Sequence, residues 1–152
     1  MALLKYTTEV GADRTVAEIE KALALAGAQA VMKEFDPGTK LPVALSFRLE
    51  TAQGVISFRL PARIDSAVKV LNRQAAAGKV PRNLQNNREQ ATRIAWRIVR
   101  ELLLCQLAMI ELEQAESTEM LLGFAQTPDG RTLFEVMKLK KFDLLALGPP
   151  KS

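Results

Sequence analysis

The residues of this chain that could do chemistry are arginines and carboxylates, because its 152 residues include no histidine and one cysteine, Cys105. Without histidine, neither a Ser-His-Asp nor a Cys-His nucleophile can be assembled. One cysteine supplies too few ligands for a Cys/His zinc site. The sequence has no glycine-rich phosphate loop and no dinucleotide-binding glycine motif. We therefore expect no catalytic residues, no metal and no cofactor, and we expect Cys105 to be a small buried hydrophobe.

Carboxylates leave one catalytic alternative. Asp129, Glu135 and Lys138 are of the types found in metal-dependent nuclease sites. Residues 127–130, however, have the composition of a turn, and Thr132 has the capping-box spacing to Glu135, which explains this glutamate without a metal. A nuclease therefore ranks last among the functions that we consider.

Positive charge is concentrated in one part of the chain, although the net charge is only +4. Residues 69–100 contain eight lysines or arginines and a single glutamate, whereas residues 101–119 contain five glutamates and no basic residue. Arg93, Arg97 and Arg100 are spaced by four and three positions, so on a helix they form one stripe. Such a concentration of basic residues is typical of surfaces that bind polyanions.

Trp96, the only tryptophan, lies beside this stripe. An exposed indole can stack on a base while neighbouring arginines contact phosphates, as in proteins that bind single strands. The amide-rich segment 79–88 could add hydrogen bonds to the nucleic-acid backbone and to base edges. The alternative is a solvated charged helix face with the tryptophan in the core. The nucleic-acid-binding site predicted here comprises Arg93, Trp96, Arg97, Arg100, Arg82, Arg88, Lys79, Arg48 and Arg59.

Arg48 and Arg59 join this site because of a predicted β-hairpin. Apolar and polar residues alternate on both sides of a turn at 51–54, which indicates two half-buried strands. Both plausible turn lengths put Phe47 and Phe58 on one face and the two arginines on the other. Like charges close together on a sheet cost stability, and a bound anion would relieve that cost.

The hairpin is preceded by a predicted helix and strand and followed by helices. Thr15 and Glu18 have the spacing of a capping box that opens a helix, and Gly27 is placed to end it. A further strand is predicted over 31–35 and a second helix over 65–77. The hairpin thus completes a small antiparallel meander with helices on one face.

A long helix is expected to begin after a cap at or near Asn87 and to run to about Glu116. Its second half contains an apolar run that begins at Leu102 and ends at Ile110, with apolar residues nearly all round. A helix of this composition is buried on most sides. We therefore expect it to be the central strut of the domain or a contact between copies of the chain.

The predicted fold class is α+β: a small antiparallel sheet of three to four strands, with one N-terminal helix and a long central helix packed on it. We assign residues 1–145 to a single domain and residues 146–152 to a C-terminal tail. The end of the chain is expected to dock in part through Phe142, Leu144 and Leu145.

Five segments carry a resemblance to a known family: 6–10, 15–19, 58–61, 95–99 and 127–135, which read YTTEV, TVAEI, FRLP, AWRIV and TPDGRTLFE. In these segments the chain resembles a family of short proteins of unknown function found in bacteriophage and prophage genomes. The resemblance implies no activity. It implies an accessory role, for instance in phage DNA replication, recombination or host takeover.

Two non-catalytic functions therefore stand beside the nuclease. The first is a binder of single-stranded nucleic acid, and the second is a protein–protein interaction module that inhibits or assembles a host or phage enzyme. The second rests on the apolar run and the glutamates that follow it. No secretory signal, membrane span or disulfide is expected, which favours the cytoplasm.

Overall fold

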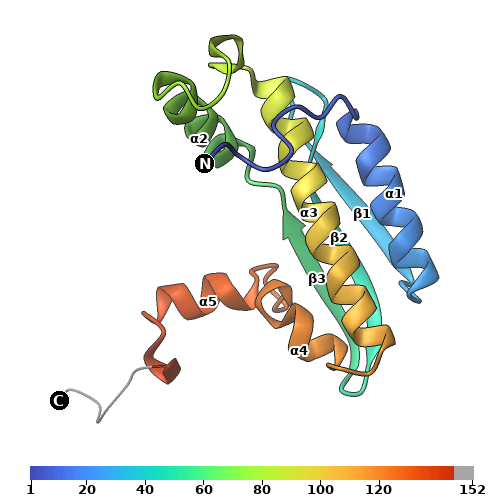
Figure 1. Ribbon diagram of the computed structural model, residues 1–152. Coiled ribbons are helices and arrows are strands. Elements are labelled where there is room, and N and C mark those ends of the chain that lie inside the picture. The colour runs from blue at the N-terminus through green and yellow to red at the C-terminus, as the bar shows by residue number, and fades with distance from the viewer. Residues whose placement is uncertain (146–152) are drawn as a thin grey trace, which may run out of the picture.

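The computed structural model, which describes residues 1–145, has the α+β fold that the sequence predicts (Figure 1). The predicted tail, residues 146–152, lies outside the described part. The helices and strands, in chain order, are α1 (Ala12–Leu25), β1 (Ala30–Phe35), β2 (Pro42–Thr51), β3 (Gly54–Pro61), α2 (Ile64–Ala76), α3 (Arg88–Glu111), α4 (Ser117–Leu121) and α5 (Leu133–Leu139), with 3₁₀ turns η1 (Arg82–Leu84), η2 (Leu122–Phe124) and η3 (Asp143–Leu145).

The three strands form an antiparallel sheet in the order β1-β2-β3. Phe47 on β2 is directly opposite Phe58 on β3, and their rings stack with centroids 5.5 Å apart. The two-residue turn between these strands ends at Gly54, whose φ of +103° suits a residue without a Cβ. The hairpin and the facing of its aromatic residues are therefore as predicted.

Helices α1 and α3 lie side by side across one face of the sheet (Figure 1). Val16, Ile19 and Leu23 are buried on the inner face of α1. The predicted start of this helix is wrong by four residues, because Gly11 rather than Thr15 precedes the helix, α1 begins at Ala12, and Thr15 is a buried residue of its first turn. The predicted end is confirmed, since the chain turns out of the helix through a left-handed Gly27.

Helix α3 is shared between two hydrophobic clusters. Ala91 and Ile94 pack with α2 in a smaller cluster, whereas Trp96 and Leu103 belong to the main core over the sheet. The predicted cap is confirmed, because the side chain of Asn87 accepts a hydrogen bond of 3.0 Å from the third residue of the helix. A helix of 24 residues spans about 36 Å.

The end of α3 differs from the prediction. The helix stops at Glu111 rather than Glu116, and Glu113 adopts a left-handed conformation as the chain leaves it. The apolar run was expected to be buried on most sides, but Leu102 and Met109 are 49% and 40% exposed. Helices α1 and α4 and the sheet thus leave part of this half of α3 uncovered.

Cys105, in the same run, is exposed rather than buried as predicted. The side chain therefore presents a lone thiol on the uncovered face of α3, where it is available for labelling.

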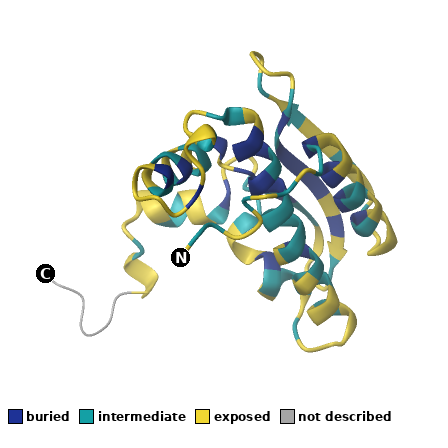
Figure 2. Cartoon of the chain, turned by 45° about the horizontal axis from the view of Figure 1, so that its top comes forward, coloured by how far each residue is buried: buried dark blue, intermediate teal, exposed yellow. Residues whose placement is uncertain are grey.

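The chain after α4 leads away from the body (Figures 1 and 2). A short segment first pairs with the free edge of β3, with Ala125 opposite Phe58. Thr132 then caps α5 as predicted, accepting a hydrogen bond of 3.2 Å from the backbone of Glu135. The expected docking of Leu144 and Leu145 is wrong, because both side chains are largely exposed. Within residues 1–145, no helix combines the length and the apolar character needed to cross a membrane.

Candidate nucleic-acid interface

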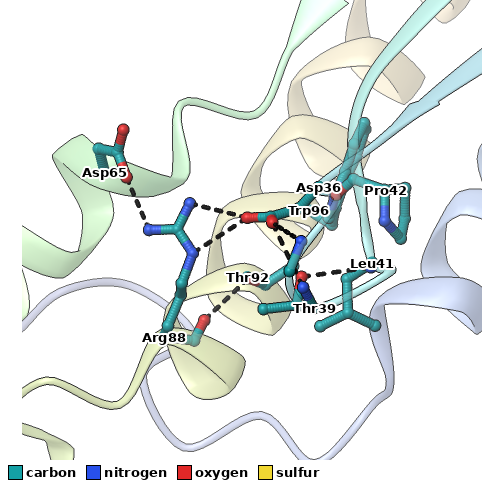
Figure 3. A network of polar contacts seen from close by, with 9 residues as sticks. Asp36, Thr39, Leu41, Pro42, Asp65, Arg88, Thr92 and Trp96 are labelled. Atoms are coloured by element: carbon teal, nitrogen blue, oxygen red, sulfur yellow. Dashed lines mark hydrogen bonds and ion pairs between the residues drawn. The ribbon is translucent and has the colours of Figure 1, made fainter.

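Trp96 lies in the core, so the interpretation in which it stacks on a base is corrected. The side chain is 0% exposed, and its indole nitrogen donates a 2.8 Å hydrogen bond to the carbonyl oxygen of Pro42 at the start of β2 (Figure 3). Tryptophan is large and apolar except for one N–H donor, and this environment satisfies both parts. The alternative of a core tryptophan is therefore the correct one, and no base can reach the ring.

The arginine stripe on α3 faces carboxylates of the same chain. Arg93 donates to Glu89, one turn earlier, at 2.8 Å. Arg97 donates to Glu18 on α1 at 2.9 Å, and Arg100 forms an ion pair with the same carboxylate at 2.7 Å. All three arginine side chains are partly buried. Arg97 and Arg100 thus join α3 to α1, Arg93 pairs within α3, and the stripe does not present free guanidinium groups to a polyanion.

Glu18 illustrates the electrostatics of this contact. Burial disfavours its charged form and by itself raises the pKa. The hydrogen bond from Arg97 and the positive charges of Arg100 and Arg97 outweigh that effect, and the pKa of Glu18 falls below its ordinary value. The carboxylate is therefore ionised wherever the protein is folded near neutral pH.

Arg88 also has carboxylate partners (Figure 3). It donates to Asp65 at 2.6 Å and to Asp36 at 3.1 and 3.3 Å, and so joins the start of α3 to the start of α2 and to the turn after β1. Asp36 accepts further bonds from the backbone N–H groups of Gly38 and Thr39, and these lower its pKa, with Arg88 contributing less. The hydrogen bond to Asp65 is the main reason that the pKa of Arg88 is raised.

The two hairpin arginines lie on the sheet face opposite the helices but differ in their partners. Arg59 makes two hydrogen bonds to Glu34 on β1, at 2.8 and 3.3 Å. This carboxylate offsets the repulsion that a bound anion was expected to relieve. Arg48 is exposed and makes no ion pair within the described residues.

The remaining residues of the predicted site, Lys79 and Arg82, lie in the loop between α2 and α3. Both are exposed, and neither makes an ion pair to any residue in the range 1–145. Lys69 and Arg73 on α2 share these properties. We call these four residues the basic end.

The basic end has a defined shape. Leu71 and Ala75 are buried against α3, so Lys69 and Arg73, one turn apart, project from the opposite face of α2. The loop is fastened to this helix by two hydrogen bonds between Asn72 and Asn86, of 2.7 and 3.0 Å. In Figure 1 the loop lies beside α2 at one end of the molecule.

The basic end is free of competing carboxylates along the chain. Residues 66–88 contain no aspartate or glutamate, and the flanking Asp65 is bound by Arg88. Lys69 and Arg73 contribute to the charge count of the sequence, but they were not among the predicted site residues. The absence of acidic residues between Asp65 and Glu89 is the signal that could have identified them.

Of the residues considered for a nuclease, Asp129 and Glu135 have local partners. Asp129 accepts hydrogen bonds from Thr127 and from the backbone of Arg131, and the bond from Thr127 is the main reason that its pKa is lowered. The Thr132 hydroxyl donates to Glu135 at 3.1 Å. Across residues 1–145, no group of three or more histidine, cysteine, aspartate or glutamate side chains is placed to hold a metal ion.

No family model, curated protein or solved structure matches the chain.

Proposed function

We propose that this protein binds nucleic acid without catalysing a reaction, and that the basic end makes the contacts to phosphate. The observation that carries the proposal is the set of four exposed cations that make no ion pair within residues 1–145, in a stretch that contains no acidic residue. A cation already paired with a carboxylate must give up that partner to bind a phosphate. An unpaired, hydrated cation releases only water and counterions.

Single strands are the proposed ligand, with contacts that do not include base stacking on Trp96. Residues 64–87 contain no aromatic residue, so this stretch supplies no stacking platform of its own. The exposed amides of Asn83 and Gln85 are the groups that could hydrogen bond to the base edges of an unpaired strand. We propose phosphate contacts as the source of affinity and these amides as the source of any preference for single strands.

The test is a fluorescence-anisotropy titration with a labelled single strand and with its duplex, each at two salt concentrations. Four phosphate contacts to a single strand give a slope of log K against log salt of about −2.8, so a fourfold rise in salt weakens binding by about 50-fold. Binding of the duplex with higher affinity would contradict the single-strand preference alone. No binding of either at low salt, or binding that ignores salt, would contradict the whole proposal.

A pair of double variants locates the surface. Lys69→Ala with Arg73→Ala removes two of the four cations, and we expect the salt slope to become shallower by about 1.4. Arg14→Ala with Lys21→Ala removes the same charge from exposed positions on α1. This control tests the net charge, and equal weakening by both variants would show that the basic end is not the site.

The second candidate function, a protein–protein interaction module, is favoured by one observation. Apolar side chains of α3 that the sequence places in a core are exposed, including Leu102 and Met109. Pull-down from nuclease-treated host lysate tests it, because recovery of a protein partner after the nucleic acid is destroyed supports this candidate. A phage accessory role and a cytoplasmic location belong to either proposal.

A further inference from the structure

The segment from α5 to residue 145 forms an arm with apolar and basic side chains and little cover. Leu139, Leu144 and Leu145 are 67%, 86% and 69% exposed, and no residue of α5 is buried. The arm is held together internally by Phe134 and Phe142, whose ring centroids are 5.7 Å apart. A helix of only seven residues is unstable alone in water, so an arm of this kind calls for a surface to pack on.

The arm is also positively charged where it is most exposed. Lys138, Lys140 and Lys141 flank Leu139, and none of the three makes an ion pair within residues 1–145. A partner surface for the arm should therefore be apolar with an acidic margin.

A groove of this description lies on the same molecule, between the C-terminal ends of α1 and α3. It is about 680 Å³ in volume, and Leu25, Leu107 and Ile110 contribute its apolar lining. Glu50 and Glu111 are also in the lining, and neither makes an ion pair with a described residue. Leu25 is 82% exposed, which shows how open the groove is.

The arm of the same chain does not occupy this groove. Figure 1 shows α5 leading away from the body, with α4 between the arm and the ends of α1 and α3. A second copy has no such constraint. We propose that the arm of one copy, residues 133–145, docks into the groove of a second copy, and that the exchange is reciprocal.

The reciprocal exchange is limited to two copies. Each copy has one arm and one groove, so a reciprocal exchange closes on a two-fold axis and leaves no site open. The leucines of the arm meet the apolar lining, and its lysines meet the unpaired glutamates. The basic end lies at the other end of α3 and takes no part, so this inference does not depend on nucleic-acid binding.

The first measurement is the mass of the full chain by light scattering over a range of concentrations. We expect a rise from 16.7 kDa toward twice that value. Leu139→Glu, at an exposed position, should raise the dissociation constant of the dimer by at least about tenfold. Leu4→Glu makes the same change at a leucine of similar exposure outside the arm and the groove, and it should leave the dimer unchanged. A monomer at every concentration would overturn the inference.

Charge reversal identifies the two surfaces. One variant carries Lys138→Glu, Lys140→Glu and Lys141→Glu on the arm, and the other carries Glu50→Lys and Glu111→Lys in the groove. Each variant alone should be monomeric, because its arm and its groove then have the same charge. Mixing them should restore a dimer containing one copy of each. Failure of the mixture to dimerise, with both variants folded by circular dichroism, would overturn the pairing of arm and groove.

The lone thiol gives an independent readout. Cys105 lies one turn before Ala108, which is part of the groove lining, so a photo-crosslinker attached to this cysteine can reach a docked arm. We expect crosslinks to residues 133–145 of the second copy. Ala108→Trp, which fills the groove from an exposed position, should abolish them. Crosslinks confined to other segments would place the contact elsewhere and overturn the inference.

Discussion

Replacing Trp96 with phenylalanine tests whether this residue serves the core rather than a ligand. The indole is completely buried and donates one hydrogen bond, to the carbonyl of Pro42. Phenylalanine keeps an aromatic ring but removes the donor and leaves a small void. The expected result is a less stable protein that binds nucleic acid as well as the original does.

The magnitude follows from two contributions. Leaving the buried Pro42 carbonyl without its donor costs about 1–3 kcal/mol. The volume lost between indole and phenyl adds about 1 kcal/mol if the core does not collapse around it. The free energy of unfolding should therefore fall by about 2–4 kcal/mol. With a urea m-value of about 2 kcal/mol/M, the midpoint shifts down by about 1–2 M.

Urea titration followed by circular dichroism measures this shift. Phe35→Leu, at an exposed aromatic residue, is the control and should change stability by no more than about 0.5 kcal/mol. The original protein offers a direct check as well, since its single tryptophan should resist iodide quenching until the chain unfolds. An unchanged midpoint for Trp96→Phe, or free quenching of the folded protein, would refute the placement of this residue.

Two further predictions concern stability in acid and the glycine that follows α2. Because the folded-state pKa of Glu18 lies below its ordinary value of 4.5, its stabilising contribution is complete above that pH and is lost as the pH falls through the lower, folded pKa. The melting temperature of Glu18→Gln should therefore lie furthest below that of the original protein near neutral pH, and the two should converge in acid. Glu9→Gln, at an exposed position, should melt at the same temperature as the original at both pH values. Gly78→Ala should cost about 1–2 kcal/mol, because φ is +74° there. Gly123→Ala, with no such φ and open space around the new Cβ, should be neutral or slightly stabilising in the same urea titration.

The parts of the fold that are predicted correctly are those determined by residues close together in the sequence. Alternation over a few positions defines β2 and β3, and the oxygen-bearing side chains of Asn87 and Thr132 cap the helices that follow them. The start of α1 is an exception. Thr15 has the spacing of a cap, yet α1 begins at Ala12, because a capping pattern does not exclude an earlier start where the chain can already turn.

The charge partners could not be predicted in this way. Arg97 and Glu18 are 79 positions apart, and Arg88 and Asp36 are 52 apart. Their contact depends on how α1, α3 and the sheet pack, which the local sequence does not specify. A stripe of arginines on a helix has the same spacing whether it faces water, a phosphate or a glutamate of another helix.

The second half of α3 shows a related limit. Apolar residues on nearly all sides are typical of a buried helix. The hydrophobic pattern of a helix does not show, however, whether other elements of the fold are present to cover it. The exposed leucine and methionine show that the elements formed by residues 1–145 do not surround it. The same pattern therefore fits a core strut and a contact with another molecule.

The double role of α3 restricts how the length of this chain can vary in evolution. Successive helical residues are turned by about 100°, so one residue inserted between Ile94 and Leu103 would rotate Leu103 by that angle relative to Ile94. Ile94 packs in the smaller cluster and Leu103 in the larger, so after such an insertion the two side chains could not both pack in their clusters. Relatives of this protein should therefore keep the length of this helix fixed, and their insertions should fall in the hairpin turn at 52–53 or in the loop at 79–87.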